Sequence, residues 1–330
     1  MKIVDTTSFL TIVSYHYVRP IGDSQYASIK GLEKTDFEGQ MEYIMRHYNL
    51  VSMEHVVASI RGEEQLPQMA LLLAFDDGFS DHYLHVFPYL VAHGIPAAFY
   101  PSVSPTVERK MLDVHKIHFI LACETNKIAL VDSLNEYIEH ARESFDLEPI
   151  HVYEKDYKNP NRFDPGEVIY IKRMLQHVLP DVLRTKITDN MFGKFVTNDQ
   201  GAFADELYLN EEQLKIMIAE GMHVGGHGVH HEWLNHCDKS HQESIVRDCR
   251  VFLDSIGASR QFMTFCYPYG AYNDDTKAII ARHGFDLAMT TEVGITDLTL
   301  HDNYMLPRLD TNDLPKSCEA EMVSWTRNLM

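Results

Sequence analysis

The 330-residue sequence has little of several features that mark common classes of protein. Its five cysteines are odd in number and widely spread, without any CxxC pair, which predicts free thiols and no disulfide framework. Basic residues are also scarce. Only 29 Lys and Arg stand against 48 Asp and Glu, and the resulting net charge of -19 repels phosphate backbones and anionic lipid surfaces. We therefore expect no nucleic acid partner.

Long apolar runs are absent as well. No segment reaches the roughly 20 apolar residues that a membrane span requires, so none is expected. The N-terminal segment lacks the unbroken apolar stretch and the small-residue cleavage site of a secretory signal. Together with the free thiols, these absences predict a cytoplasmic location. The sequence does not indicate the oligomeric state.

What the sequence does contain is a repeated alternation of short apolar runs with longer amphipathic segments. This pattern is typical of βα units and predicts an α/β fold with a parallel sheet or barrel. The length suits one barrel-sized domain over residues 1–330 or two smaller ones. The expected strands are 11–18, 69–75, 95–100, 222–225, 262–267 and 285–289. The expected helices are 37–48, 53–60, 81–92, 211–219, 241–256 and 274–283.

Residues 102–205 interrupt the alternation. They contain long helical patterns at 116–123, 128–144 and 167–179, and a charged segment at 153–165 that we expect to be an exposed loop. We interpret the whole stretch as an insertion that forms a helical cap on a single domain.

Two carboxylates, Asp76 and Asp77, directly follow the buried strand expected at 69–75. The carboxyl ends of strands are where α/β barrels assemble their active sites. Asp77 is therefore a candidate oxygen ligand for a metal, and Asp76 a candidate general base for water attack on a carbonyl. The alternative is a solvated turn, since Asp and Gly are ordinary turn formers.

His227 and His231 are four residues apart. On a helical turn both imidazoles would project from one face and could hold one divalent ion. His230, three residues after His227, could share that face too, and a polar loop is the alternative.

An aromatic strand end forms a third element at Phe265-Cys266-Tyr267-Pro268-Tyr269-Gly270. A backbone N–H there could stabilise an oxyanion, and aromatic rings could stack on a sugar face. The alternative is a buried strand that ends in a tight turn. Trp233, shortly after the histidines, either packs on this loop or contacts the substrate.

In this order, the three elements resemble the motifs of the polysaccharide deacetylase family, the NodB-homology carbohydrate esterases. Phe75 to Gly78 is similar to the family's Thr-Phe-Asp-Asp-Gly, with Ala74 in place of Thr. His227 to His231 is similar to His-Ser/Thr-x-x-His, with Gly228 in place of the hydroxyl residue. Tyr267 to Gly270 resembles the third motif of the Tyr-Pro-Tyr-Gly branch. The resemblance covers about residues 71–100 and 207–289.

The resemblance implies a distorted (β/α) barrel and a metal-dependent hydrolase that removes the N-acetyl group of an acetamido sugar. Zinc is the metal implied first, with cobalt, nickel or iron as alternatives. It further implies a set of residue roles: Asp77, His227 and His231 as metal ligands, Asp76 as general base, and the Tyr269 N–H in an oxyanion hole. The aromatic residues themselves make Tyr267, Tyr269 and Trp233 the candidate substrate contacts.

The sequence departs from the family at two positions. Many members have an arginine in the third motif that holds the base, whereas the comparable positions here are Met263 and Cys266. Arg308 is the candidate to replace it, because a guanidinium can bind a carboxylate through two N–H groups. The alternative is a surface arginine. The catalytic acid is either His16, after the first strand, or His301, in a weak match to the family's last motif.

Two further functions stay open at this level. The same metal, base and oxyanion hole could cleave a non-sugar amide or cyclic imide. A protein that has lost catalysis could bind carbohydrate on the same scaffold. If the chain is a cytoplasmic deacetylase, its substrate is expected to be a small or activated precursor, such as a nucleotide-linked or lipid-linked amino sugar.

Overall fold

The computed structural model describes residues 8–161, 164–258 and 261–329. The chain separates into two compact units. The first comprises residues 1–20, 31–110 and 205–330, and the second comprises 21–30 and 111–204. The second unit therefore begins later than the expected insertion at 102 and includes a segment that precedes the first helix. Its role as a cap stays a prediction.

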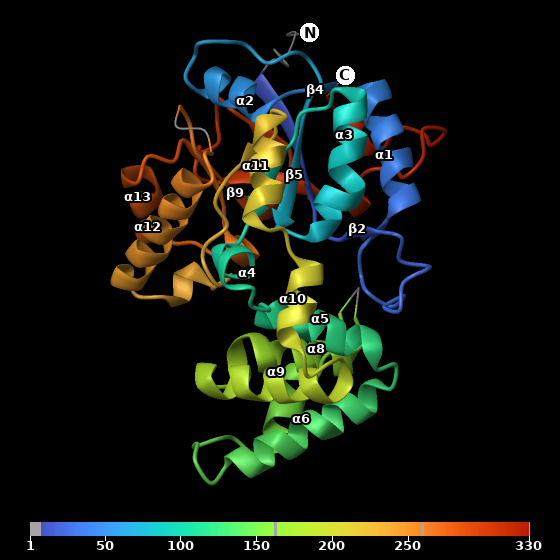
Figure 1. Ribbon diagram of the computed structural model, residues 1–330, viewed down its shortest axis with the longest axis vertical. Coiled ribbons are helices and arrows are strands. Elements are labelled where there is room, and N and C mark those ends of the chain that lie inside the picture. The colour runs from blue at the N-terminus through green and yellow to red at the C-terminus, as the bar shows by residue number, and fades with distance from the viewer. Residues whose placement is uncertain (1–7, 162–163, 259–260, 330) are drawn as a thin grey trace. The chain divides into compact units, whose positions relative to one another are not determined.

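The strands of the first unit form one curled sheet (Figure 1). Its members are β1 (Phe9–Tyr15), β4 (Asn49–Leu50), β5 (Ala70–Asp77), β6 (Ala98–Pro101), β7 (His223–Val224), β8 (Thr264–Cys266), β9 (Leu287–Val293), β10 (Thr296–Asp297) and β11 (Leu306–Asp310). The order is β7-β6-β5-β1-β11-β9-β8, all parallel, with β4 parallel to β5 and β10 antiparallel to β1. A separate short pair joins β2 (Val18–Arg19) to β3 (Leu32–Glu33).

The two ends of this strand order meet at Gly226. Its N–H donates to the carbonyl of Thr264 at 2.9 Å, and the N–H of Cys266 donates to the carbonyl of Gly226 at 2.8 Å. These bonds connect the segment after β7 to β8 and curl the sheet toward a barrel. The predicted α/β class with a distorted barrel is confirmed.

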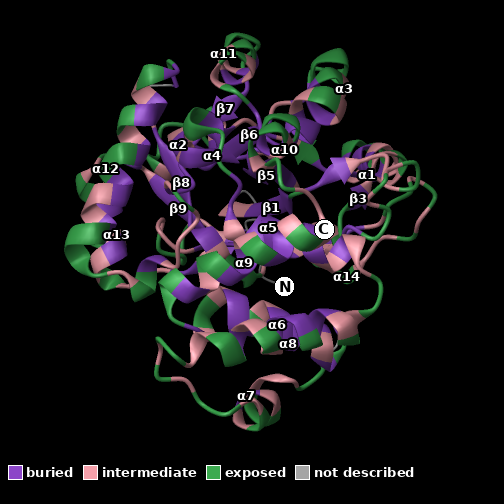
Figure 2. Ribbon diagram, turned by 60° about the horizontal axis from the view of Figure 1, so that its bottom comes forward, coloured by how far each residue is buried: buried purple, intermediate pink, exposed green. Residues whose placement is uncertain are grey.

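Alternation along the strands divides the apolar side chains between two cores. Leu72 and Ala74 of β5 pack with Ile12 of β1 in one cluster, whose helix residues come from the helix Met53–Ile60. Leu73 and Phe75 belong to the other cluster, which includes residues of most other helices of this unit. Figure 2 shows the strands as mainly buried and the surrounding helices as buried on one side only. Residues of even number on β5 therefore point into the barrel, and those of odd number point toward the helices.

Helices of the first unit are α1 (Lys34–His47), α2 (Met53–Ile60), α3 (Phe87–His93), α4 (Val103–Glu108), α11 (Glu211–Ala219), α12 (Lys239–Ser255), α13 (Asp274–Arg282) and α14 (Ser324–Arg327). Side-chain caps begin several of them. Ser52 accepts from the N–H of His55 at the start of α2, and Asn210 forms a capping box with Gln213 at the start of α11. None of the helices among the described residues is long and apolar enough to cross a membrane.

The second unit is helical, with α5 (Asp113–Cys123), α6 (Lys127–Ala141), α7 (Ile150–Tyr157), α8 (Gly166–Arg173) and α9 (Asp181–Phe195). The next helix, α10 (Gln200–Leu207), crosses from this unit into the first. Phe203 packs edge-on against Phe119 and Phe192, with ring centroids 4.8 and 5.2 Å apart. Tyr26 contacts Phe119 at 4.9 Å, which explains why residues 21–30 belong to this unit.

The loop expected at 153–165 was wrong, and one strand was missed. The segment 153–165 is not a single loop, because Tyr153 to Tyr157 continue α7 and Tyr153 is buried; residues 162–163 lie outside the described part. The strand β11 was not expected at all. Its five residues include Pro307, which weakens the strand signal in the sequence. All five cysteines are free, as predicted.

We predict that Gly225→Ala destabilises the first unit by about 1–3 kcal/mol through overpacking. A Cβ at this position would meet the Tyr100 ring and lie 2.7 Å from the Thr264 carbonyl oxygen. The measurement is denaturant unfolding. Gly201→Ala is the matched control, since its Cβ would only contact the Asp199 carboxylate at 3.7 Å. Equal stability of both variants would contradict the close approach at Gly225.

Candidate active site

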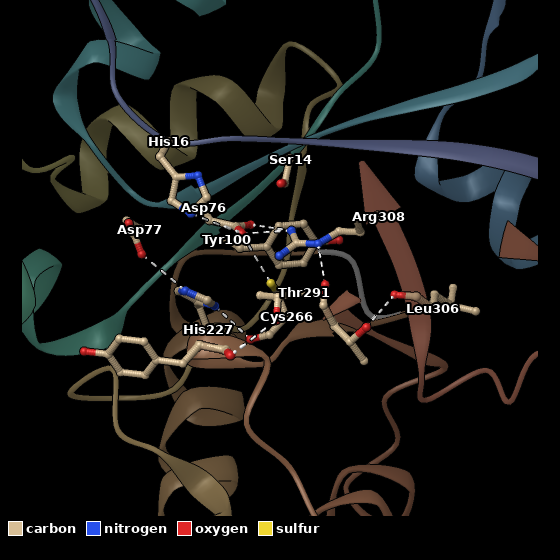
Figure 3. Close-up of polar contacts among 12 residues, drawn as sticks. Ser14, His16, Asp76, Asp77, Tyr100, His227, Cys266, Thr291, Leu306 and Arg308 are labelled. Carbon is tan, nitrogen blue, oxygen red and sulfur yellow. Dashed lines mark hydrogen bonds and ion pairs between the residues drawn. The ribbon is translucent and has the colours of Figure 1, made fainter. Parts of the chain in front are cut away.

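The two adjacent carboxylates at the end of β5 point in different directions. Asp76 is an even-numbered residue of this strand, so its side chain points into the barrel. Asp77, with a φ of 71°, is the last residue of the strand. Both side chains are buried, with 2% and 6% of their surface exposed. Figure 3 shows Asp76 turned toward Arg308 and Asp77 turned toward His227. Each carboxylate therefore has its own cationic or imidazole partner.

Asp76 forms a buried ion pair with Arg308 of β11. The Arg308 Nη1 atom lies 3.0 Å from Oδ1 and 2.8 Å from Oδ2, and its Nε donates to the Thr290 carbonyl at 2.8 Å. Only 3% of the Arg308 side chain is exposed. The thiol of Cys266 donates to Asp76 Oδ2 at 3.5 Å. The structure thus brings Arg308 to the Asp76 carboxylate, as expected from the sequence.

The electrostatics of Asp76 favour its charged form. Burial alone would raise the pKa of this carboxyl, but Arg308, with His227 and His16, lowers it below its usual value. Burial also raises the pKa of the Cys266 thiol, so this sulfur remains protonated and can donate. Asp76 is therefore an ionised acceptor near neutral pH.

Asp77, His227 and His231 converge on one point. The Nε2 atoms of both histidines lie 3.3 Å from Asp77 Oδ1, and the three potential ligand atoms are all within 4.8 Å of one another. Two imidazole nitrogens and one carboxylate oxygen are the donor set of many catalytic zinc sites. The residues present therefore fit a divalent metal ion. His230 is exposed and belongs to no such group among the described residues.

The histidine segment converges without being helical. Residues 227–231 form no regular element, and the predicted helical turn was wrong. Gly228 and His231 both have positive φ, 70° and 56°. Asp77, His231 and Tyr269 are three of the five non-glycine residues with positive φ in the described chain, so backbone strain concentrates at this site.

His227 is oriented by a second contact. Its Nδ1 donates to the carbonyl oxygen of Cys266 at 2.7 Å, which directs Nε2 toward Asp77. Burial alone would lower the pKa of His227, but the neighbouring Cys266, Asp77 and Asp76 raise it well above its usual value. A divalent ion would have to displace this proton on binding.

Of the two acid candidates, His16 is the one that lies near Asp76. Its Nε2 is 3.9 Å from Asp76 Oδ2, and about half of the side chain (49%) is exposed. His301 is exposed and holds a local turn, with its Nδ1 accepting from the Asp297 N–H at 2.8 Å. The geometry therefore favours His16 over His301.

Sequence reasoning missed the residue that positions His16. His82 is fully buried in a π-helical turn at His82–Val86, and its Nε2 donates to the His16 carbonyl at 2.8 Å. Burial lowers the pKa of His82, so the ring stays neutral. Its place five residues after Asp77 was the available signal, although a single buried histidine carries little information in a sequence.

The three aromatic candidates occupy different positions. Tyr267 is 1% exposed, and its hydroxyl donates to the Tyr304 carbonyl at 3.1 Å, so we assign it to the core and not to a substrate surface. Tyr269 and Trp233 are partly exposed and stack with centroids 4.4 Å apart and planes at 10°. The Tyr269 ring also contacts His231 at 4.4 Å. The stacked pair therefore borders the candidate metal ligands.

Comparison with known proteins finds similarity to polysaccharide deacetylases in the part of the chain that contains the second and third motifs. A sequence model described as polysaccharide deacetylase matches residues 182–288. The chain is 31% identical over 87 residues to a putative polysaccharide deacetylase, YxkH, of Bacillus subtilis (strain 168), a match that covers 26% of this chain and 31% of that relative. The matched part is thus about a third of that protein.

Two solved structures share the fold over nearly the whole chain. One is the deacetylase PplD of Streptococcus pyogenes in complex with acetate, with a TM-score of 0.56, 17% identity, and 92% of each chain covered. The other is IcaB from Ammonifex degensii, with a TM-score of 0.55, 17% identity, and 97% and 95% covered.

We predict that Arg308→Met lowers the free energy of unfolding by about 3–5 kcal/mol near pH 7, because it leaves the Asp76 charge buried without its partner. The loss should shrink on acidification. In the unaltered protein the lowered pKa of Asp76 adds stability that disappears as pH falls through that pKa, whereas in the variant protonation removes an unpaired charge. Denaturant unfolding at several pH values measures both effects.

The matched control is Arg61→Met, which breaks an exposed pair with Asp286 and should cost less. In the double variant Asp76→Asn/Arg308→Met, the loss should be smaller than the sum of the two single losses. Strict additivity would show that the two residues do not interact.

Proposed function

We propose that the chain is a member of the polysaccharide deacetylase family, whose sequence model matches residues 182–288, and that it hydrolyses the acetamide of an N-acetylated amino sugar. The products would be acetate and the free amine. The observation that carries this proposal is the convergence of Asp77, His227 and His231 beside a separate, ionised Asp76. One set of ligands and one spare carboxylate are what water attack on a carbonyl requires.

We propose Asp77, His227 and His231 as the ligands of a divalent ion, zinc first and cobalt, nickel or iron as alternatives. Such an ion, when bound, would polarise the acetamide carbonyl and make water more acidic. The Cys266 carbonyl supports this set from outside by fixing the His227 ring.

The remaining steps fall to residues of the chain. Asp76 would take the proton of the attacking water, and Arg308 would hold this carboxylate in place and keep it ionised. His16, 3.9 Å from Asp76, would give a proton to the leaving amine as the C–N bond breaks. The N–H of Tyr269, in a turn with a φ of 57°, would donate to the oxyanion.

The sugar itself would meet the stacked Trp233 and Tyr269 rings, since parallel aromatic faces bind the apolar face of a pyranose. This surface lies against His231 and so beside the reacting group. The Tyr-Pro-Tyr-Gly branch, the cytoplasmic location and a small or activated substrate stay predictions.

We predict that Asp76→Asn retains the metal but lowers acetate release by about 100-fold or more, because the amide cannot accept the proton. Asp77→Asn should instead weaken metal binding. The measurements are metal content after dialysis and acetate release from acetylated nucleotide sugars, monosaccharides and short chitin-like oligomers. If the two variants behave alike, the separate roles are wrong. If the unaltered, metal-loaded protein releases no acetate, the alternatives of a binding protein or a non-sugar amidase gain support.

A separate prediction concerns the acid. His16→Asn should lower kcat by roughly 100- to 10,000-fold with metal content unchanged, because the leaving amine then lacks its proton donor. His301→Asn is the matched control and should keep full activity, since this exposed ring only holds a turn. A larger loss in the His301 variant would reverse the assignment.

A further inference from the structure

A second group of metal-binding side chains lies in the segment that follows His231. Glu232, Cys237 and His241 each offer one ligand atom, and these three atoms lie within 4.8 Å of one another. Carboxylate oxygen, thiolate sulfur and imidazole nitrogen are all zinc ligands. The group shares no residue with the candidate active site.

The Cys237 thiol donates to the Trp233 carbonyl at 3.5 Å, and the Glu232 carboxylate is only partly accounted for by hydrogen bonds. Glu232 Oε1 accepts from His241 Nε2 at 2.7 Å. Glu232 Oε2 is buried, yet it has no hydrogen-bond partner within the described part of the chain. A buried carboxylate oxygen without a partner costs free energy, and a bound cation would remove that cost.

Hydrogen bonds hold the backbone at two of the three residues, Cys237 and His241. The N–H of Cys237 donates to the Leu234 carbonyl at 3.1 Å, and the Cys237 carbonyl accepts from the Gln242 side chain at 3.0 Å. At the start of α12, Asp238 accepts from the N–H of His241 at 2.8 Å. The backbone at these two residues would therefore need little rearrangement to bind an ion.

We propose that Glu232, Cys237 and His241 bind a zinc-like divalent ion, with a position left for water or a fourth ligand. Binding would release the protons of the Cys237 thiol and the His241 imidazole. The ion would fasten the segment 232–238 to α12. Because this segment carries Trp233 and follows His231 directly, the second ion would stabilise the stack of Trp233 on Tyr269. The proposal does not depend on the proposed reaction.

Cobalt provides a test that separates the two sites. A thiolate bound to Co²⁺ gives an intense charge-transfer band in the near ultraviolet, and the proposed active-site ligands Asp77, His227 and His231 contain no sulfur. We expect this band in the full chain reconstituted with Co²⁺, and two zinc ions per chain after dialysis against zinc. Cys237→Ser should abolish the band and reduce the zinc content to one.

Matched variants complete the experiment. Cys318→Ser, which removes another partly exposed thiol, should keep the band. Asp77→Asn should keep it too, although the other ion is weakened, so failure of the active-site assignment is distinguishable from failure of this one. Glu232→Gln keeps the thiol and should weaken Co²⁺ affinity about tenfold or more. Absence of the band from the unaltered protein, or its persistence in the Cys237 variant, would overturn the proposal.

Discussion

The arrangement of the catalytic candidates depends on the buried ion pair between Asp76 and Arg308. These residues come from β5 and β11, which lie on either side of β1 in the sheet. Their side chains meet inside the barrel because both strands direct these positions inward and the sheet curls. Neither charge is stable in this environment alone, so the registers of three strands and the position of the base are coupled.

A second constraint is the alternation of side chains along β5. It turns two adjacent carboxylates toward different partners, so that their mutual repulsion is offset on both sides. Asp76 is matched by Arg308, and Asp77 by the imidazoles of His227 and His231. Proximity in sequence thus produces two chemically different groups. The positive φ of Asp77 marks the residue at which the strand ends and the following turn begins.

The sequence predicted the parts of this site that directly follow strongly apolar runs. Such a run indicates a buried strand, and the residue where the run stops indicates where the strand ends. Asp76, Asp77 and the turn after β8 belong to this class. The convergence of His227 and His231 was expected from helical spacing, whereas a strained loop achieves it, and one sequence cannot specify positive φ at a histidine. Arg308 was expected from chemistry, while its strand, short and interrupted by Pro307, was not. The helical unit was foreseen in the middle of the chain, but its inclusion of residues 21–30 arises from tertiary aromatic contacts.

The hydrogen bonds at Gly226 have an effect beyond shaping the barrel. Outer strands of a sheet expose unpaired backbone groups that can recruit a strand from another molecule. Here β7 and β8 are the outer strands of the sheet order. The hydrogen bonds of Gly226 with Thr264 and Cys266 pair backbone N–H and C=O groups that these strands would otherwise expose. A side chain at Gly226 would collide with Cys249 and Phe265, at 2.7 and 2.8 Å. The absence of a side chain at Gly226 thus lets the two strands meet and leaves fewer unpaired backbone groups at the edges of the sheet.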